Sequence, residues 1–572
     1  MIEIKNVGFR YGKGATVLEQ LNLHLKPGSI YGLLGENGVG KTTLLKMMAG
    51  LLFPNEGDIR VLGFEPRKRE AAFLQQIYFL PDSPQVEEIS LERYAKLNAC
   101  LYPNFSEADL HRYVSDLDVD SRRAMHKLSF GQQKKAMLAF ALACNTPVLL
   151  MDEPTNGLDI PSKSQLRRLI ASAATEDKCF VISTHQVRDL EQLIDPVVIM
   201  ERQRVLLNDS LAEIDARLWF GVAAEKPENC LYAEPAMGGY YVVTPRTEGM
   251  PDSKVQLEAL FNAAIANRAY FQETFGQNGV RGGRTAMPDT PSDPTVVEHR
   301  GGEPASPALE PADAPAVRIS PFKRFGCFLW AEMFTKYKQY FLMLGIILGL
   351  YLWNWMSYLF SAGDFASETV YGASRGVAAL WLTVLSPYIL YRDLYHPVKG
   401  FSFMMRPAGN VAKFAAIWLQ SVVIVPVLLL LWCGLLDGVV SLLTQHTLGG
   451  HPLATVFGFF HDDAASLRVG PTLALATAFI FGPQASVLWG TCFFKRHKLL
   501  KLMATYFVLT CLASWLILRL AVVFPNFELD WLKTLDVKTT ERWLEALAYT
   551  GVFSLCIGLY VWSFFSFRRR QL

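Results

Sequence analysis

The fold of the N-terminal part of the chain is decided by the stretch Ile30-Tyr-Gly-Leu-Leu34-Gly35-Glu-Asn37-Gly38-Val-Gly40-Lys41-Thr42-Thr43. A strand-like apolar run leads into a loop of the form GxxxxGK[ST], and a helix-like segment follows from Leu44. Glycines allow backbone N–H groups to turn inward around an anion, and the start of the helix adds partial positive charge. The pattern therefore predicts a phosphate-binding loop, with Lys41 on the phosphates and the Thr42 hydroxyl on Mg²⁺.

A second apolar run, Val148–Met151, ends in two acids, Asp152 and Glu153. Asp152 is expected to hold Mg²⁺, and Glu153 stands where a general base would activate water against a γ-phosphate. A third motif opens a helix at Leu128-Ser129-Phe-Gly131-Gln132. Ser129 suits a helix cap, and the same helix start could bind an anion; the residues alone leave both interpretations open.

Composition limits the class of protein. The chain has 572 residues, of which 51% are hydrophobic and 19% charged, with a net charge of +2. These values exclude a secreted enzyme, a disordered chain and a basic chromatin-type protein, and they give no reason to expect a nucleic-acid partner. The nine cysteines form no CxxC pair, which argues against disulfides and zinc. The N-terminus shows no signal-peptide pattern, so we expect the chain to start in the cytoplasm.

The chain changes character three times. Residues 1–220 alternate short apolar runs with amphipathic stretches, which predicts an α/β domain with a mostly parallel sheet. Residues 221–277 form a small α/β accessory segment, with a strand at Gly239–Thr244 and a helix at Lys254–Phe275. Residues 278–318 contain seven Pro, five Gly and no aromatic residue, and we interpret them as a flexible linker.

Residues 319–572 are predicted to form an all-α transmembrane domain with six spans. An amphipathic helix at 319–338 precedes long uncharged runs, and crossing a bilayer takes about 20 apolar residues. The runs are Gln339–Gly363, Gly376–Tyr391, Phe414–Leu436, Val469–Phe494, Leu502–Leu518 and Ala546–Phe567. Lys and Arg residues are concentrated in the segments that would lie on the same side of the membrane as the N-terminus, with fewer in the loops on the other side. We therefore expect a multi-pass protein of the inner or plasma membrane, with both termini and the α/β domain cytoplasmic.

Taken together, the motifs of residues 1–215 resemble those of the ATP-binding cassette (ABC) ATPases. They fall in the family's order: an aromatic loop at Tyr11, Walker A at Gly35–Thr43, a signature at Leu128–Gln132, Walker B at Val148–Glu153, a D-loop at Asn156–Asp159 and a switch histidine at His185. The resemblance implies a P-loop NTPase fold, with ATP and Mg²⁺ as cofactors.

The resemblance also implies roles for single residues. Glu153 and His185 would be catalytic, and Thr42, Asp82 and Asp152 would bind the metal. Contacts to the nucleotide would come from Tyr11, Gly35, Asn37, Gly38, Gly40, Lys41, Thr42, Thr43, Ser129, Gly131, Gln132 and Asp159. Tyr11 would stack on adenine, and Ser129 and Gly131 would act on the ATP of a second subunit.

Two positions depart from the family's pattern. Asp82 stands where the family usually has Gln, and its shorter side chain puts the sensing role of that position in doubt. Phe130 stands where the signature usually has Gly, while Ser129 and Gly131 are retained.

The order of the two halves is similar to that of half-size, ABCG-like exporters. This similarity implies an ATP-hydrolysing exporter, and one ATPase with one six-span domain per chain makes a homodimer the simplest working unit. Because the spans hold few charges, we expect the cargo to be a hydrophobic or amphipathic small molecule, lipid or peptide. A membrane-anchored ATP-driven sensor is the alternative. Arg406 lies in a basic loop between the second and third spans, and it is either a turn that contacts the ATPase or a membrane-proximal charge. The loop 437–468, predicted on the outer side of the membrane, holds five polar residues that are either metal ligands or solvated groups: His446, His451, His461, Asp462 and Asp463.

Overall fold

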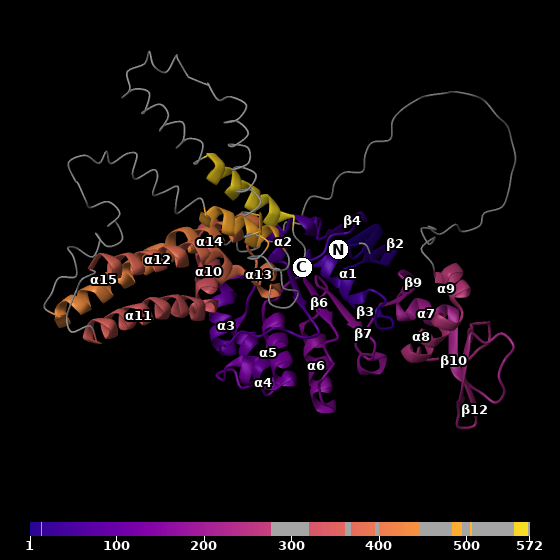
Figure 1. Ribbon diagram of the computed structural model, residues 1–572. Coiled ribbons are helices and arrows are strands. Elements are labelled where there is room, and N and C mark those ends of the chain that lie inside the picture. Colours follow the sequence, from indigo (N-terminus) through magenta and orange to yellow (C-terminus); the bar gives the residue numbers. More distant parts are fainter. Residues whose placement is uncertain are drawn as a thin grey trace, which may run out of the picture. The chain divides into compact units, whose positions relative to one another are not determined.

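The computed structural model describes residues 1–12, 14–275, 320–360, 368–394, 400–444, 483–494, 501, 504–505 and 554–569. These residues form two compact units (Figure 1). The first comprises Met1–Arg324 and the short segment Met404–Pro407, and the second comprises Phe325–Phe403 and Ala408–Leu572. The predicted linker 278–318, most of the predicted span Leu502–Leu518 and the five acids and histidines of the outer loop lie outside the described residues.

The first unit is built on a six-stranded sheet with the order β5-β6-β7-β3-β8-β9. Its strands are β3 (Ser29–Leu34), β5 (Ile77–Leu80), β6 (Val148–Asp152), β7 (Cys179–Thr184), β8 (Val197–Glu201) and β9 (Arg204–Asp209). The pairs from β5 to β8 are parallel, and β9 is antiparallel to β8. Every residue of β5, β6, β7 and β8 is buried, as expected for strands covered on both faces. The predicted mostly parallel sheet is confirmed.

Parallel order brings the carboxyl ends of these strands to one edge of the sheet. The phosphate loop follows β3, Asp82 follows β5, Glu153 follows β6 and His185 follows β7. Since ligands of open α/β sheets bind outside the carboxyl ends of the strands, this edge is where a site is expected.

A second, antiparallel sheet has the order β2-β1-β4 and lies in the same unit. Its strands are β1 (Ile2–Arg10), β2 (Thr16–Leu25) and β4 (Glu56–Val61). The helices of this part are α1 (Lys41–Met48), α2 (Ala71–Leu74), α3 (Leu91–Asn98), α4 (Glu107–Asp116), α5 (Phe130–Ala143) and α6 (Ile160–Ala173), with single turns at Pro66–Lys68, Ala99–Leu101, Met125–Lys127 and Val187–Asp189.

The predicted accessory segment forms a three-stranded antiparallel sheet of order β10-β12-β11 with helices beside it. The elements are β10 (Leu218–Ala223), β11 (Tyr232–Ala236), β12 (Gly239–Pro245), α8 (Leu257–Ala266) and α9 (Arg268–Phe275). The helix α7 (Leu211–Arg217) comes before the predicted segment, and β10 begins three residues before its predicted start at residue 221. The single helix predicted over Lys254–Phe275 is wrong, because Asn267 interrupts it. The Asn267 backbone leaves the helical region at φ −123° and ψ 54°, and its side-chain amide donates to the Leu231 carbonyl.

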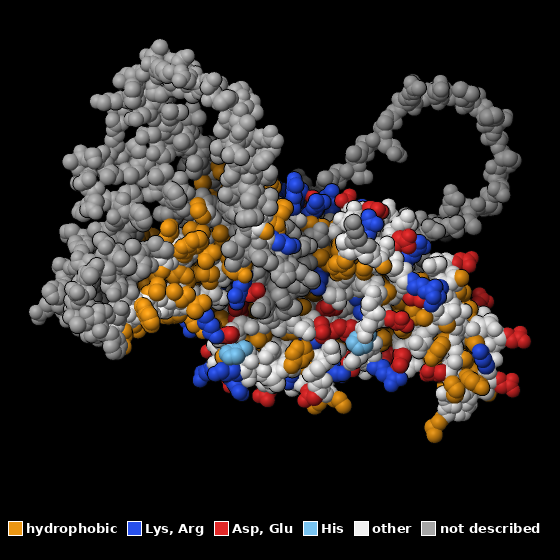
Figure 2. Space-filling view, viewed as in Figure 1, with side chains coloured by type: hydrophobic (Ala, Val, Ile, Leu, Met, Phe, Trp, Pro, Cys, Tyr) orange, Lys and Arg blue, Asp and Glu red, His pale blue; other side chains and the backbone are white. Residues whose placement is uncertain are grey.

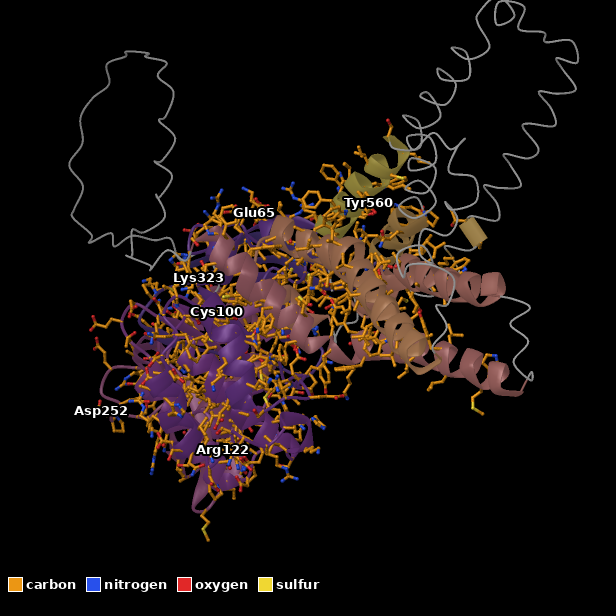
Figure 3. All side chains as sticks on the ribbon, turned by 90° about the vertical axis from the view of Figure 1, so that its left-hand side faces the viewer. Glu65, Cys100, Arg122, Asp252, Lys323 and Tyr560 are labelled. Carbon is orange, nitrogen blue, oxygen red and sulfur yellow. The ribbon has the colours of Figure 1, made fainter. Side chains whose placement is uncertain are left out.

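The described part of the second unit is helical. Its elements are α10 (Pro321–Thr335), which begins in the first unit, α11 (Tyr337–Phe360), α12 (Glu368–Tyr391), α13 (Phe401–Met405), α14 (Asn410–Trp418), a π-helical stretch at Leu419–Ile424 and α15 (Val425–Thr444). Residues 483–493 and 554–568 are also helical. Tyr560, labelled in Figure 3, lies on the latter helix. Its ring packs against that of Trp418, with centroids 6.3 Å apart.

Among the described residues, one continuous stretch, Asn410–Leu436, is long and apolar enough to cross a membrane by length and composition. It contains the predicted span Phe414–Leu436. Apolar side chains gather on the described part of this unit that faces the viewer in Figure 2, and Phe341, Trp353 and Leu431 are among the exposed ones. An exposed apolar surface of this kind is typical of contact with lipid or with another protein.

Candidate nucleotide-binding site

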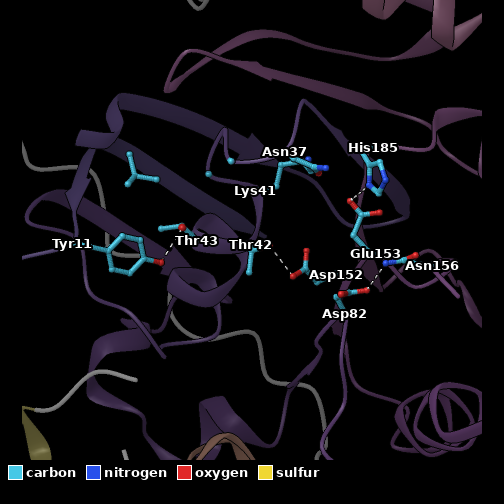
Figure 4. A pocket seen from close by; sticks show the side chains of 13 residues that line it. Tyr11, Asn37, Lys41, Thr42, Thr43, Asp82, Asp152, Glu153, Asn156 and His185 are labelled. Atoms are coloured by element: carbon cyan, nitrogen blue, oxygen red, sulfur yellow. Dashed lines mark hydrogen bonds and ion pairs between the residues drawn. The ribbon is translucent and has the colours of Figure 1, made fainter. Parts of the chain in front are cut away.

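A pocket of about 530 Å³ opens at the carboxyl edge of the six-stranded sheet. It is lined by Tyr11, Val17, Asn37, Gly38, Gly40, Lys41, Thr42, Thr43, Asp82, Asp152, Glu153, Asn156 and His185. Figure 4 shows the phosphate loop on one side of this pocket and the acids that follow β5 and β6 on the other. The volume falls within the usual range for small-molecule sites.

The loop between β3 and α1 needs glycine at Gly40, the residue that directly precedes the helix. Its φ is 109°, and a Cβ atom there would lie 2.8 Å from the Leu18 side chain. Gly38 also has a positive φ, of 85°. These conformations turn the chain so that α1 starts at Lys41, and the first residues of the helix, Lys41, Thr42 and Thr43, line the pocket. The loop is therefore shaped to receive an anion.

Lys41 is buried at the centre of the loop. Its Nζ donates to the Gly35 carbonyl at 2.6 Å and to the Glu36 carbonyl at 3.1 Å. Burial lowers the pKa of Lys41, and the negative charges of Glu153 and Asp152 oppose that shift. The ammonium thus stands among acceptors that a phosphate could replace.

Thr42 and Asp152 meet across the pocket and form a donor set suited to Mg²⁺. The Thr42 hydroxyl donates to Asp152 Oδ2 at 2.8 Å, and the Ser183 hydroxyl donates to Asp152 Oδ1 at 2.5 Å. Hydroxyl and carboxylate oxygens are the ligands that Mg²⁺ prefers. Ser183 fixes the carboxylate from β7, a contact across 31 residues that the sequence did not reveal.

Glu153 and His185 form a pair on the other side of the pocket. His185 Nδ1 lies 2.7 Å from Glu153 Oε1. The second carboxylate oxygen, Glu153 Oε2, is buried and has no hydrogen-bond partner within the described structure. A buried acceptor in a polar pocket calls for a donor, and a water molecule or substrate hydroxyl would supply one. This geometry suits a general base oriented by a histidine.

Tyr11 lies at the opposite end of the pocket, directly after β1. Half of its surface is exposed, its ring packs edge-on against Phe9, and its hydroxyl lies 3.0 Å from Thr43 Oγ1. An exposed ring face beside a phosphate loop is suited to stacking on a base.

Five of the predicted nucleotide contacts do not line the pocket. Gly35 lies inside the loop, where its carbonyl accepts from Lys41. Ser129 Oγ accepts from the Gln132 N–H at 3.3 Å, which confirms the predicted cap of α5. Asp159 caps α6 through the Ser162 N–H. Gly131 and Gln132, in the first turn of α5, are also absent from the lining.

Asn156 and Val17 line the pocket although the sequence did not single them out for contact. Asn156 belongs to the D-loop quoted above, but only Asp159 was predicted from it. The Asn156 amide donates to Asp82 Oδ1 at 3.1 Å. Asp82 thus lies in the pocket, and its role as a metal ligand stays a prediction.

The segment Met404–Pro407 packs within the first unit. Arg406 is 5% exposed; its Nε donates to Asn98 Oδ1 at 3.0 Å, and its guanidinium lies 3.3 Å from Glu87 Oε1. Arg69 also reaches this segment, at the sulfur of Met404. Of the two interpretations of Arg406, the structure supports the turn that contacts the α/β domain.

Comparisons with known proteins place residues 18–156 in the sequence profile described as "ABC transporter". The bacitracin transport ATP-binding protein BcrA of Enterococcus faecalis is 30% identical over 223 residues, which cover 38% of this chain and 71% of BcrA. The ABC transporter ATP-binding protein NatA of Bacillus subtilis is 30% identical over 211 residues, 35% of this chain and 85% of NatA. A solved ATP-binding subunit of an ABC transporter is 27% identical, with a TM-score of 0.35, and the match covers 37% of this chain and 91% of that one.

Proposed function

The chain belongs to the ABC transporter family, and on that premise we propose that it is one half of a homodimeric ATP-driven exporter of a hydrophobic or amphipathic solute. Its cassette is an ATPase whose hydrolysis of ATP is coupled to transport. The observation that carries the proposal is the convergence of the phosphate loop, the Thr42–Asp152 pair and the Glu153–His185 pair in one pocket.

The chemistry follows from the positions of these side chains. The loop N–H groups and Lys41 bind the phosphates, and Lys41 exchanges its two carbonyl acceptors for phosphate oxygens. Thr42 and Asp152 would hold Mg²⁺, which when bound supplies positive charge beside the phosphates. Glu153 Oε2 accepts the proton of the attacking water, and His185 holds the carboxylate in place through Oε1.

A second copy is needed to complete each site. Ser129 and Gly131 do not reach the pocket of their own chain, and Phe130 between them is 45% exposed. In the proposed dimer, the start of α5 therefore approaches the ATP bound by the partner, where the N–H groups of its first turn bind phosphate.

The apolar second half supports a membrane role. We propose the six spans and the cytoplasmic termini described above, with Asn410–Leu436 as the third span. The name of the relative BcrA mentions transport of bacitracin, which supports an amphipathic cargo. Arg406 would carry the motion of the cassette to the spans, because its segment packs against α3.

The proposed dimer is tested by mixing two inactive chains. A Lys41→Ala/Glu153→Gln chain and a Ser129→Arg chain each form homodimers with two damaged sites. In the mixed dimer both lesions fall on one ATP site, so ATPase activity should reappear in the mixture, provided that one whole site suffices. Absence of activity in a verified mixed dimer, together with full wild-type activity as a monomer, contradicts the shared site.

Transport is tested separately with the wild-type chain in sealed vesicles. ATP-dependent movement of an amphipathic peptide or lipid across the bilayer is the expected result. ATP hydrolysis without flux of any solute in a broad panel would instead favour the membrane-anchored sensor.

A further inference from the structure

Lys134 lies on α5, five residues after the Ser129 cap, and has no part in the roles described so far. Its side chain is 2% exposed. An ammonium group carries three N–H donors, and here it meets three acceptors: Glu153 O at 2.6 Å, Asn156 O at 3.0 Å and Asp82 Oδ1 at 3.1 Å. Glu153 and Asn156 belong to the turn that follows β6, and Asp82 follows the neighbouring strand β5.

The contact with Glu153 bears on the backbone of the general base. Glu153 has a φ of 47°, in the left-handed region that a non-glycine residue adopts only when its surroundings hold it there. The Glu153 N–H donates to the Ser183 carbonyl, and the two heavy atoms lie 3.1 Å apart. Its carbonyl accepts from Lys134 Nζ at 2.6 Å and, more weakly, from the Asn156 N–H at 3.2 Å. The orientation of the Glu153 side chain therefore depends on a hydrogen bond at each end of the residue.

The same ammonium connects the two positions that depart from the family's pattern. The carboxylate of Asp82 lies beside it, and the ring centroid of Phe130 lies 5.6 Å away, within the range of a cation–π contact. Phe130 also packs on the D-loop, where a Cβ at Gly157 would lie 3.0 Å from its ring. A buried ammonium needs a counter-ion, which a Gln at position 82 would not supply.

We propose that Lys134 is a positioning residue for the general base, and that Asp82 serves as its counter-ion. Lys134 holds the Glu153 and Asn156 carbonyls in one arrangement, and so fixes where the Glu153 carboxylate points. Because Lys134 is on the helix that begins with the signature, the start of that helix and the catalytic turn move together. Lys134 does not line the nucleotide pocket, so its loss should slow hydrolysis without weakening ATP binding.

The first test compares Lys134→Met with Lys135→Met in the full-length chain in lipid nanodiscs. Lys135→Met removes the same charge one residue further along α5 and is expected to behave as wild type. Lys134→Met should lower kcat about 100-fold, the effect of a misplaced catalytic group, while KM and the binding of a fluorescent ATP analogue stay within about twofold. Wild-type kcat in Lys134→Met, or an equal loss in both variants, would overturn the proposal.

The second test asks what Asp82 does, through a double-mutant cycle with Asp82→Asn. If Asp82 is the counter-ion, Asp82→Asn lowers the melting temperature in the wild-type background and has little effect when Lys134 is already Met. A rise in the Mg²⁺ concentration needed for half-maximal activity, equal in both backgrounds, would assign Asp82 to the metal instead and overturn this half of the proposal.

The double variant Lys134→Met/Asp82→Asn is a control for misfolding of Lys134→Met. Because both charges are removed, it leaves no carboxylate without its counter-ion. It should bind the ATP analogue and remain slow. Lys134→Gln, which keeps two N–H donors for the two carbonyls, should recover part of kcat. Recovery of the full wild-type kcat in the double variant would show that the ammonium positions nothing.

Discussion

Replacing Glu153 by Gln gives the sharpest test of the catalytic geometry. Glutamine has the same shape and keeps an Oε1 acceptor for His185, so the 2.7 Å contact can persist. What it loses is the ability of the second oxygen, which has no protein partner, to accept a proton from water. A general base contributes about 10²–10⁴-fold to rate, which corresponds to about 3–5 kcal/mol in the barrier.

The binding of ATP should survive this substitution. Lys41, the loop N–H groups and Thr42 are untouched, and one negative charge fewer lies near the phosphates. We therefore expect the affinity for ATP to stay within about threefold, while kcat falls by the full factor.

The assay is steady-state phosphate release from the reconstituted chain, together with binding of a fluorescent ATP analogue. Glu176→Gln, the same change at an exposed carboxylate between α6 and β7, is the matched control and should keep wild-type kcat. Turnover within about threefold of wild type in Glu153→Gln would refute the assignment of the base.

Three further outcomes follow from the site. Thr42→Val should raise the Mg²⁺ concentration needed for half-maximal ATPase activity, because it removes one hydroxyl ligand; an unchanged Mg²⁺ titration would contradict the metal assignment. Tyr11→Ala should raise KM for ATP about tenfold while Tyr11→Phe does not, since stacking of a base on an aromatic ring is worth roughly 1–3 kcal/mol. Arg406→Ala should keep ATP binding but reduce the amount of solute transported per ATP hydrolysed. Arg392→Ala, which removes an exposed charge from the same predicted loop (residues 392–413), should leave that ratio unchanged, and an equal ratio in both variants would exclude a coupling role for Arg406.

The parts of the site that the sequence predicted are those defined by consecutive residues. The loop from Gly35 to Thr43 and the acids at the end of β6 lie where their motifs place them, because a strand, a tight turn and a helix start are local structures. The Ser129 cap was predictable for the same reason, since its acceptor and its donor are three residues apart.

The parts that could not be predicted depend on contacts between distant segments. Lys134 and Asp82 are 52 residues apart, and Ser183 and Asp152 are 31 apart, so neither pairing is visible in a linear pattern. Asp82 was assigned to Mg²⁺ by its place in the family's order, whereas its Oδ1 faces Lys134 and Asn156. The helix break at Asn267 could not be predicted, because the apolar pattern of Lys254–Phe275 continues across it. The hydrogen bond that accompanies the break runs from the Asn267 amide to the Leu231 carbonyl, on a distant segment.

The two carbonyl groups that hold Lys41 also bear on how the nucleotide leaves. Removing a phosphate from a buried ammonium would normally strand the charge, and that penalty would slow product release. Here the ammonium can return to Gly35 and Glu36, so the loop itself supplies replacement acceptors. Without these acceptors, a lysine that binds the phosphates of ATP strongly would also release ADP slowly. Because Lys41 can exchange phosphate oxygens for these two carbonyls, the same side chain can bind ATP tightly and release ADP quickly. When the nucleotide leaves, one set of hydrogen bonds replaces another, and the buried ammonium is not left without acceptors.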